Sequence, residues 1–280
     1  MGLYAGGENR NPADQELDLR AALDVAKEAA TAVGDLLLGG IDSNADKHAR
    51  SKILPNDVVT AFDLRAEETI VEKIAASYPD HGVLSEEGTD MPGNSVYRWI
   101  IDPLDGTSNF LSGFPHFSVS LALLHRDLTL VGCIFDPSRN EMFTAVLGQG
   151  AFLNDRKIEV SPRTCVRGGL VAVGLSSLPE RAVAASERIK WLIPHARSLR
   201  VSGSACLDLA YVSSGRLDGV FYLALSLWDV AAGGLLVREA GGSFTDLEGE
   251  APVDPERGVL ATNGEIHAEM VSILEHGRLP

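Results

Sequence analysis

Segment 99–106, an apolar run followed by two acids, a proline and a glycine, constrains the fold of this chain more than any other. The run predicts a buried strand, and Pro103 and Gly106 favour a turn directly after it. Because proline fixes its own φ, we expect the strand to end at Asp102 and to place Asp105 three residues further on the same tight bend. The sequence therefore predicts a buried strand that brings two carboxylates together.

Two carboxylates at such a spacing call for a cation. At about 4 Å they repel by about 4 kcal/mol in a medium of dielectric constant about 20, which a fold tolerates only with a compensating charge. Oxygen ligands, to which the Leu104 carbonyl could add, favour Mg²⁺, Mn²⁺ or Ca²⁺ over Zn²⁺. The residues that follow, Gly106, Thr107 and Ser108, can begin a helical turn whose free amides bind a phosphate oxygen. A divalent cation beside an anion seat indicates phosphate-ester chemistry.

Each of these signals also has a plainer structural interpretation. An Asp-Pro-x-Asp-Gly segment is a common surface turn, and the acidic pair 86–87 is by itself typical of a solvated loop. Asp63 follows Thr60 at capping-box spacing, and Asp229 alone reads as a helix N-cap. The apolar strand before the turn, and a second apolar run before the acidic pair, favour the functional interpretation.

The two halves of the chain differ in the pattern of their apolar residues. Apolar residues at alternating spacings of four and three predict a helix over 19–37 that Gly39 and Gly40 stop, and a second helix should cover 62–78. Short strands follow from 83 to 153, and the alternation in 117–121 predicts a half-buried strand. After residue 150, apolar strands alternate with helix-length segments, which favours a partly parallel sheet.

The motifs resemble those of the inositol monophosphatase family. Its members are lithium-sensitive, magnesium-dependent phosphomonoesterases. Residues 99–110 match its first signature almost letter for letter, 227–233 match its second, and 85–88 lie where the family has Gly-Glu-Glu-Ser. Weaker similarity covers 56–63 and parts of 203–219. The resemblance implies an α+β / α/β fold, a layered αβαβα sandwich of the sugar-phosphatase type. Its N-terminal sheet would be mostly antiparallel and its C-terminal sheet mixed and partly parallel.

Carried over by position, the resemblance implies a metal centre. Glu86, Asp102 and the Leu104 carbonyl would bind one Mg²⁺, and Asp102, Asp105 and Asp229 would bind a second, so that Asp102 bridges the two. A third, weaker ion would depend on Glu86, and Mn²⁺ could substitute for Mg²⁺. The N-terminal half, residues 1–150, would carry most of these ligands, and the C-terminal half, 151–280, would supply Asp229 and the substrate contacts.

The resemblance also implies catalytic and substrate-binding residues. Asp63 and Thr107 would orient and deprotonate an attacking water, with Glu86 as a further catalytic residue. The attack would be direct and in line, on the phosphate of a small phosphorylated polyol such as inositol 1-phosphate. The implied substrate contacts are Asp105, Gly106, Thr107, Ser204, Ala205, Tyr222 and Asp229.

One departure from the family leaves the substrate open. Six residues before Trp228, many inositol-specific members have a glutamate that binds ring hydroxyls, whereas this chain has Tyr222. A phenol cannot accept two hydroxyl protons as a carboxylate does. Histidinol phosphate, another sugar or cyclitol phosphate, fructose 1,6-bisphosphate and a nucleotide 3′-phosphate therefore stay open as substrates. A metal-binding regulatory protein with little turnover is the alternative from another class.

Composition argues against several classes of protein. A net charge of −15 disfavours nucleic acid as a partner, because phosphate backbones require a cationic surface. The three cysteines stand outside paired motifs, which indicates reduced thiols. The polar start, residues 1–11, has no apolar signal segment, and the sequence has no apolar window of about eighteen residues. We expect a cytoplasmic protein without a membrane partner, and the resemblance adds a homodimer.

Overall fold

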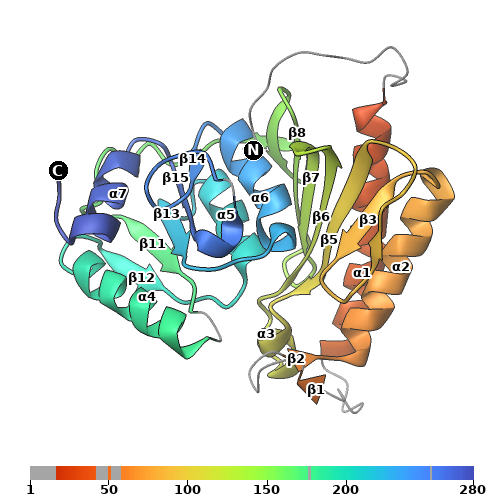
Figure 1. Ribbon diagram of the computed structural model, residues 1–280, viewed down its shortest axis with the longest axis horizontal. Coiled ribbons are helices and arrows are strands. Elements are labelled where there is room, and N and C mark those ends of the chain that lie inside the picture. Colours follow the sequence, from red (N-terminus) through yellow and green to blue (C-terminus); the bar gives the residue numbers. More distant parts are fainter. Residues whose placement is uncertain (1–16, 42–49, 52–57, 176–177, 253) are drawn as a thin grey trace.

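The computed structural model describes residues 17–41, 50–51, 58–175, 178–252 and 254–280. These residues form alternating layers of helix and sheet, in the order helix, sheet, helix, sheet, helix (Figure 1). The αβαβα sandwich is therefore confirmed. The segment 1–11 and residues 56–57 of the resemblance lie outside the described residues.

Paired helices make up the three helical layers. One outer pair covers the first sheet, a central pair separates the sheets, and another outer pair covers the second sheet. Within the described ranges, no helix has the length and hydropathy that crossing a bilayer requires. In that order, the pairs are α1 (Leu19–Ile41) with α2 (Ala61–Ser77), α5 (Ala205–Ser213) with α6 (Leu227–Glu239), and α4 (Pro179–Leu192) with α7 (His267–His276).

The first sheet has eight strands in the order β10-β9-β8-β7-β6-β5-β3-β4. Every neighbouring pair is antiparallel except β3 and β5, so the mostly antiparallel sheet is confirmed. The first sheet extends past residue 150 and ends at residue 158. The division of the chain into two halves at residue 150 stays a prediction. Its strands are β3 (Gly82–Ser85), β4 (Asp90–Met91), β5 (Tyr97–Asp105), β6 (Ser118–His125), β7 (Leu128–Asp136), β8 (Glu141–Val146), β9 (Gly150–Leu153) and β10 (Arg156–Ile158).

The second sheet has five strands in the order β12-β11-β13-β15-β14. β11 is parallel to both β12 and β13, whereas β15 is antiparallel to both its neighbours, which confirms a mixed, partly parallel sheet. Its strands are β11 (Leu170–Val173), β12 (Ser198–Arg200), β13 (Gly219–Tyr222), β14 (Ser243–Thr245) and β15 (Val259–Thr262). The remaining short elements are β1 (Arg50–Ser51), β2 (Val58–Val59), α3 (Thr107–Leu111) and a 3-10 helix (Pro255–Arg257).

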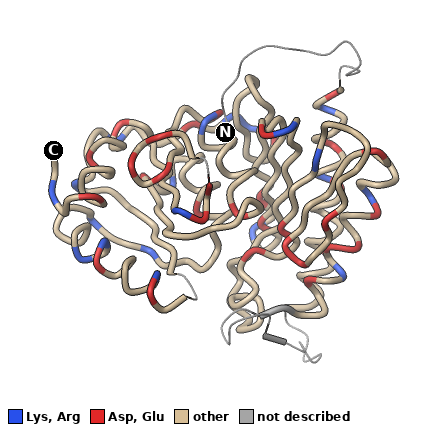
Figure 2. The backbone as a smooth tube through the Cα atoms, viewed as in Figure 1, with Lys and Arg blue, Asp and Glu red and all other residues tan. Residues whose placement is uncertain are grey.

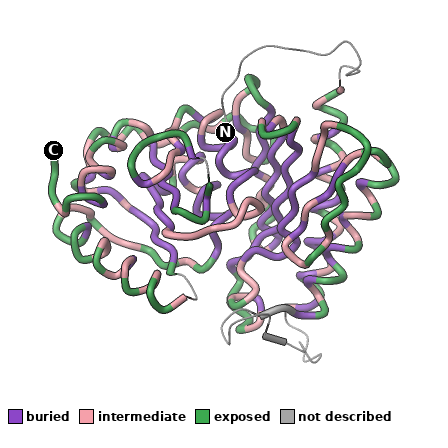
Figure 3. The backbone as a smooth tube through the Cα atoms, in the orientation of Figure 1, coloured by how far each residue is buried: buried purple, intermediate pink, exposed green. Residues whose placement is uncertain are grey.

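Both faces of the first sheet are buried (Figure 3). Side chains alternate along β5, so that Ile101 packs with α1 and α2 while Ile100 packs with α5 and α6. The prediction of a half-buried strand over 117–121 was wrong for the same reason, because β6 is buried from Ser118 to Leu124. Asp102 lies two residues after Ile100 on β5, so its side chain is on the same face of the sheet and points towards α5 and α6.

The predicted end of the first helix was also wrong, because α1 continues through Gly39 and Gly40 to Ile41. Gly40 is buried, and a Cβ there would lie 2.3 Å from an atom of the Phe62 ring on α2. The missing side chain at this position lets the two helices pack closely. Close helix packing, rather than helix termination, accounts for this glycine.

Candidate metal centre

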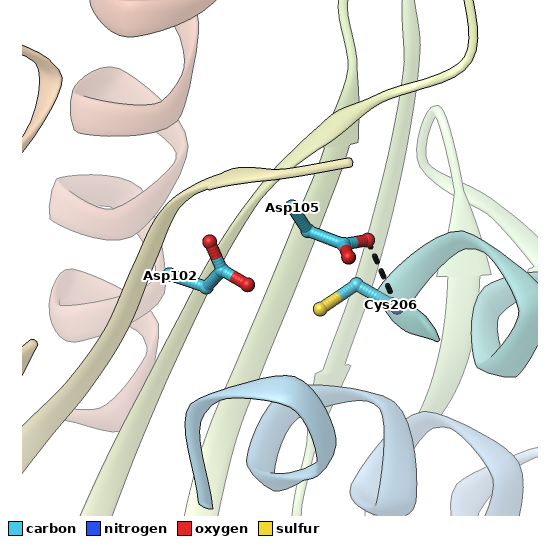
Figure 4. Close-up of side chains that lie close together, drawn as sticks. All are labelled: Asp102, Asp105 and Cys206. Atoms are coloured by element: carbon cyan, nitrogen blue, oxygen red, sulfur yellow. Dashed lines mark hydrogen bonds between the residues drawn. The ribbon is translucent and has the colours of Figure 1, made fainter. Parts of the chain in front are cut away.

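The two acids of the central motif lie on β5, on either side of a β-bulge. Asp102 pairs with Ser120 and Asp105 with Ser118, so β5 has one more residue than β6 between these pairs. The prediction that the strand ends at Asp102 was wrong, because the irregular register accommodates Pro103, which has no amide to contribute to the ladder. One oxygen each of Asp102 and Asp105 and the Cys206 sulfur lie within 4.8 Å of one another (Figure 4).

The Asp105 carboxylate binds the start of α5. Its Oδ1 accepts the Ala205 amide at 3.1 Å, and its Oδ2 accepts the Cys206 amide at 3.0 Å and the Ser118 hydroxyl at 3.1 Å. The Ser204 hydroxyl donates to Oδ2 as well. Burial raises the pKa of Asp105, and these donors oppose the shift. Asp105 thereby brings Ser204 and Ala205 to the end of β5 from about a hundred residues away.

Asp102 is the centre of an acidic cluster that also contains Glu86, Asp105 and Asp229. It is 1% exposed, and its Oδ1 accepts the Leu104 amide at 3.1 Å. Burial, followed by the charges of the other three acids, raises the pKa of Asp102 well above its usual value. Buried like charges require either protons or a cation. Because its donors are carboxylate oxygens, the cluster is suited to a hard divalent ion such as Mg²⁺.

Asp229 reaches this cluster from the start of α6. The prediction that it is the N-cap was wrong, because Ser226 is the N-cap and donates its amide to Asp229 Oδ2 at 2.6 Å. Asp229 is thus the third helical residue, whose carboxylate folds back on the cap. Its negative charge still acts on Asp102. The same side chain therefore caps a helix and belongs to the acidic cluster.

Asp63 likewise caps a helix, α2, and contacts a residue of the site, Thr107. Its Oδ2 accepts the Thr60 amide at 2.8 Å and closes the predicted capping box of α2, which is confirmed. Its Oδ1 accepts the Thr107 hydroxyl at 3.1 Å, and that hydroxyl lies 3.0 Å from the Leu104 carbonyl. Asp63 is fully buried, and burial raises its pKa. The structure thus places Asp63 and Thr107 together beside the end of β5.

Helix α3 begins directly after the acids. Gly106 is its N-cap with φ of +91°, and a Cβ there would lie 3.0 Å from the His116 carbonyl oxygen, so the turn requires glycine. The amides of the first turn have no partner within a helix and are suited to binding an anion. Asn109 donates to the carbonyls of His116 at 2.7 Å and Ser202 at 2.9 Å, which fixes α3 against the loop before α5.

Tyr222, the residue that departs from the family pattern, is directed towards α5. Its ring is 8% exposed, and its hydroxyl donates to Asp208 Oδ2 at 2.8 Å. A Cβ at Gly174 would lie 1.8 Å from the ring, so this glycine makes room for it. The carboxylate in this part of the fold is therefore that of Asp208, and the Tyr222 hydroxyl is bonded to it. The role of Tyr222 in binding substrate stays a prediction.

Tyr222→Phe is expected to destabilise the protein in a pH-dependent way. Burial raises the pKa of Asp208 to about 7, whereas the unfolded value is about 3.9. The folded state therefore holds this proton more tightly, and its contribution to stability is complete below pH about 4 and declines as the pH rises through 7. Tyr222 donates to the charged carboxylate, so we expect its removal to cost about 1.5–3 kcal/mol at pH 9 and about 0.5–1.5 kcal/mol at pH 5. Chemical denaturation in the presence of a chelator measures the free energy of unfolding at both pH values. Equal losses of stability at pH 5 and pH 9 would contradict the hydrogen bond to a charged Asp208.

Three residues of the site were missed by the sequence analysis. Ser118 could have been found, because it and Ser120 put hydroxyls on one face of an otherwise apolar strand beside the acids. Asp208 lies in the part of 203–219 that resembles the family, but no role was assigned to it from the sequence, and Cys206 gave no signal. Both approach the site only when α5 packs between the two sheets. Burial and the neighbouring acids raise the pKa of the Cys206 thiol well above its usual value.

Comparison with known proteins decides the family. A profile of the inositol monophosphatase family matches residues 18–278. The chain belongs to the inositol monophosphatase family. The resemblance inferred from the motifs is thereby confirmed.

Relatives in this family have two kinds of name. The Nus factor SuhB of Xylella fastidiosa is 44% identical over 241 residues, which cover 85% of this chain and 87% of that protein. The crystal structure of the extragenic suppressor protein SuhB from Bartonella henselae has a TM-score of 0.88 and 37% identity, and covers 92% of this chain and 99% of that one. The inositol monophosphatase from Anabaena sp. PCC 7120 has a TM-score of 0.81 and 35% identity, with 94% and 98% covered.

Proposed function

We propose that the protein is a Mg²⁺-dependent phosphomonoesterase that hydrolyses a small phosphorylated polyol such as inositol 1-phosphate. The observation that carries this proposal is the acidic cluster around buried Asp102, next to the Asp63–Thr107 pair and the start of α3. Membership of the inositol monophosphatase family supports it. The proposal extends to two or three bound ions, with Mn²⁺ as a substitute.

The chain offers two ligand sets that share Asp102. Glu86, Asp102 and the Leu104 carbonyl would hold one ion, and Asp102, Asp105 and Asp229 the other. When bound, such ions lower the pKa of a coordinated water and neutralise charge on the phosphate. Since a net charge of −15 repels phosphorylated molecules, we expect substrate binding to depend on the metal.

The polar groups around the cluster would position the substrate and move one proton. The amides of Gly106 and Thr107 would donate to phosphate oxygens, and Ser204 and Ala205, which donate to Asp105, would contact the substrate from the start of α5. The Thr107 hydroxyl would take a proton from the attacking water while it gives its own to Asp63 Oδ1, 3.1 Å away. The pKa of Asp63, raised by burial, makes it a better base. Phosphoryl transfer of this kind needs positioning and no covalent intermediate.

The name of several relatives supports a second candidate function. Proteins called Nus factor SuhB cover most of this chain, and that name denotes a factor rather than a hydrolase. A metal-binding regulatory protein with little turnover would fit it. We also propose that the protein is a cytoplasmic homodimer without a nucleic-acid or membrane partner.

A phosphate-release assay distinguishes the two candidates. The substrates are inositol 1-phosphate, histidinol phosphate, fructose 1,6-bisphosphate, a sugar phosphate and a nucleotide 3′-phosphate, each with Mg²⁺ and with a chelator. We expect Mg²⁺-dependent turnover of at least one substrate and inhibition by millimolar lithium. The order of rates would identify the substrate class that Tyr222 and Asp208 accept. No turnover of any substrate would reject the phosphatase and favour the regulatory protein.

A further inference from the structure

A cavity of about 430 Å³ lies at the edge of the second sheet remote from the metal centre. It is formed where the chain enters three neighbouring strands: Arg197 precedes β12, Gly168 precedes β11, and Asp218 precedes β13. These strands are parallel, so their amino ends share one edge of the sheet. Their carboxyl ends share the other edge, where the chain continues to Ser204 after β12 and reaches Tyr222 at the end of β13. The cavity is therefore separate from the candidate active site.

The surroundings of this cavity are basic in an acidic protein. The cavity lining contains three arginines and one acid, Asp218, whereas the whole chain has 24 Lys and Arg against 39 Asp and Glu. Basic and acidic segments alternate along α4, and a basic segment lies near β12 (Figure 2). The arginines that line the cavity are Arg163, Arg197 and Arg216. The local positive charge would attract an anion that most of the surface repels.

Two of the three arginines already form ion pairs with protein carboxylates, and Arg216 is the one whose donors are used by its partner. Arg216 makes two hydrogen bonds to Glu141, at 2.5 and 2.6 Å, and its guanidinium lies 5.1 Å from the centre of the Tyr211 ring. These contacts hold it as a wall of the cavity. Both of its terminal nitrogens are used, so it is not the group that we expect to bind a ligand.

The other two arginines retain donors that can face a ligand. Arg163 uses only its Nε, which donates to Asp218 Oδ2 at 3.1 Å. This ion pair offsets the charge of Arg163 but leaves its terminal nitrogens as donors, and Asp218 also accepts the Ser161 hydroxyl and the Leu170 amide. Among the residues that the structure describes, neither the terminal nitrogens of Arg163 nor the Arg197 guanidinium has a partner.

We propose that this cavity binds the phosphate group of a small molecule, either inorganic phosphate or a phosphate monoester. Guanidinium groups match the oxygens of a phosphate in geometry as well as charge, because each can offer two parallel N–H donors. The volume is within the range of sites for small ligands. Binding at this site would not require a divalent ion, which sets it apart from the metal centre.

The experiment titrates the full-length, chelated protein with inorganic phosphate and, separately, with glycerol phosphate. Without cations the acidic cluster repels phosphate, so heat measured by calorimetry reports on the arginine-lined cavity. We expect saturable binding to one site, weakened about tenfold or more in Arg197→Ala. The tighter of the two ligands shows whether the free or the esterified phosphate is preferred.

Arg200→Ala is the matched control. Arg200 is close in sequence, but its guanidinium binds the Ser198 hydroxyl and the Leu199 carbonyl, and it is not part of the cavity wall. We expect this variant to bind both ligands as the wild type does, and both variants to unfold at the wild-type temperature. Absence of saturable binding to the wild type, or equal weakening in both variants, would overturn the proposal.

Discussion

Asp102→Asn is expected to reduce phosphate-ester hydrolysis by roughly 10³-fold or more while leaving the metal-free fold at least as stable as the wild type. The loss follows because Asp102 is the ligand that both proposed ions share. The fold is retained because the raised pKa of Asp102 favours its neutral form, which asparagine imitates, and the Leu104 amide keeps its acceptor. Values of kcat/KM and thermal unfolding in chelator measure the two effects.

Stabilisation by Mg²⁺ supplies a readout of the same variant that is independent of activity. A ligand that binds only the folded state raises the unfolding temperature, so Mg²⁺ should stabilise the wild type and have little effect on Asp102→Asn. Glu87→Gln is the control, because it removes a charge next to Glu86 without altering a proposed ligand. We expect it to keep both activity and the response to Mg²⁺. Undiminished hydrolysis by Asp102→Asn would show that the cluster is not the metal centre.

Thr107→Val should lower kcat by about 10²–10³-fold without abolishing stabilisation by Mg²⁺. Valine matches threonine in shape but cannot pass a proton to Asp63 Oδ1, and the Thr107 side chain belongs to neither ligand set. Asp63 keeps its bonds to Thr60, so α2 remains capped.

Thr107→Ser, which restores the hydroxyl, tests whether the loss comes from proton transfer. We expect it to recover most of the activity, and stopped assays with saturating Mg²⁺ measure kcat for both variants. If the valine variant matched the wild type, or if serine gave no recovery, the proposed proton path through Thr107 would be wrong.

The closeness of Asp102 and Asp105 could be predicted from the sequence because its determinants are short and local, whereas Glu86 and Asp229 were added to them only through the family resemblance. Asp102 and Asp105 lie on one segment, and the spacing of Thr60 and Asp63 identified a capping box that the structure contains. Capping and function were treated as alternatives for Asp63 and Asp229. In the structure each carboxylate caps a helix and also lies near the end of β5, where Asp63 accepts the Thr107 hydroxyl and the charge of Asp229 acts on Asp102.

The rest depends on packing between distant parts of the chain. The bulge in β5 is defined by its register with β6, which the sequence of β5 alone does not contain. The partners of Asp105 come from residues 204–206, and the direction of Tyr222 depends on Asp208 and on the space left by Gly174. Such contacts form only when both sheets enclose α5 and α6, so no local pattern could have predicted them.

The most direct test of the proposed metal centre is anomalous diffraction from crystals soaked with Mn²⁺. The account predicts one peak bounded by Glu86, Asp102 and the Leu104 carbonyl, and a second bounded by Asp102, Asp105 and Asp229. Crystals of Asp102→Asn should lose both. Manganese bound only elsewhere, or no peak beside Asp102 at a concentration that supports turnover, would contradict it.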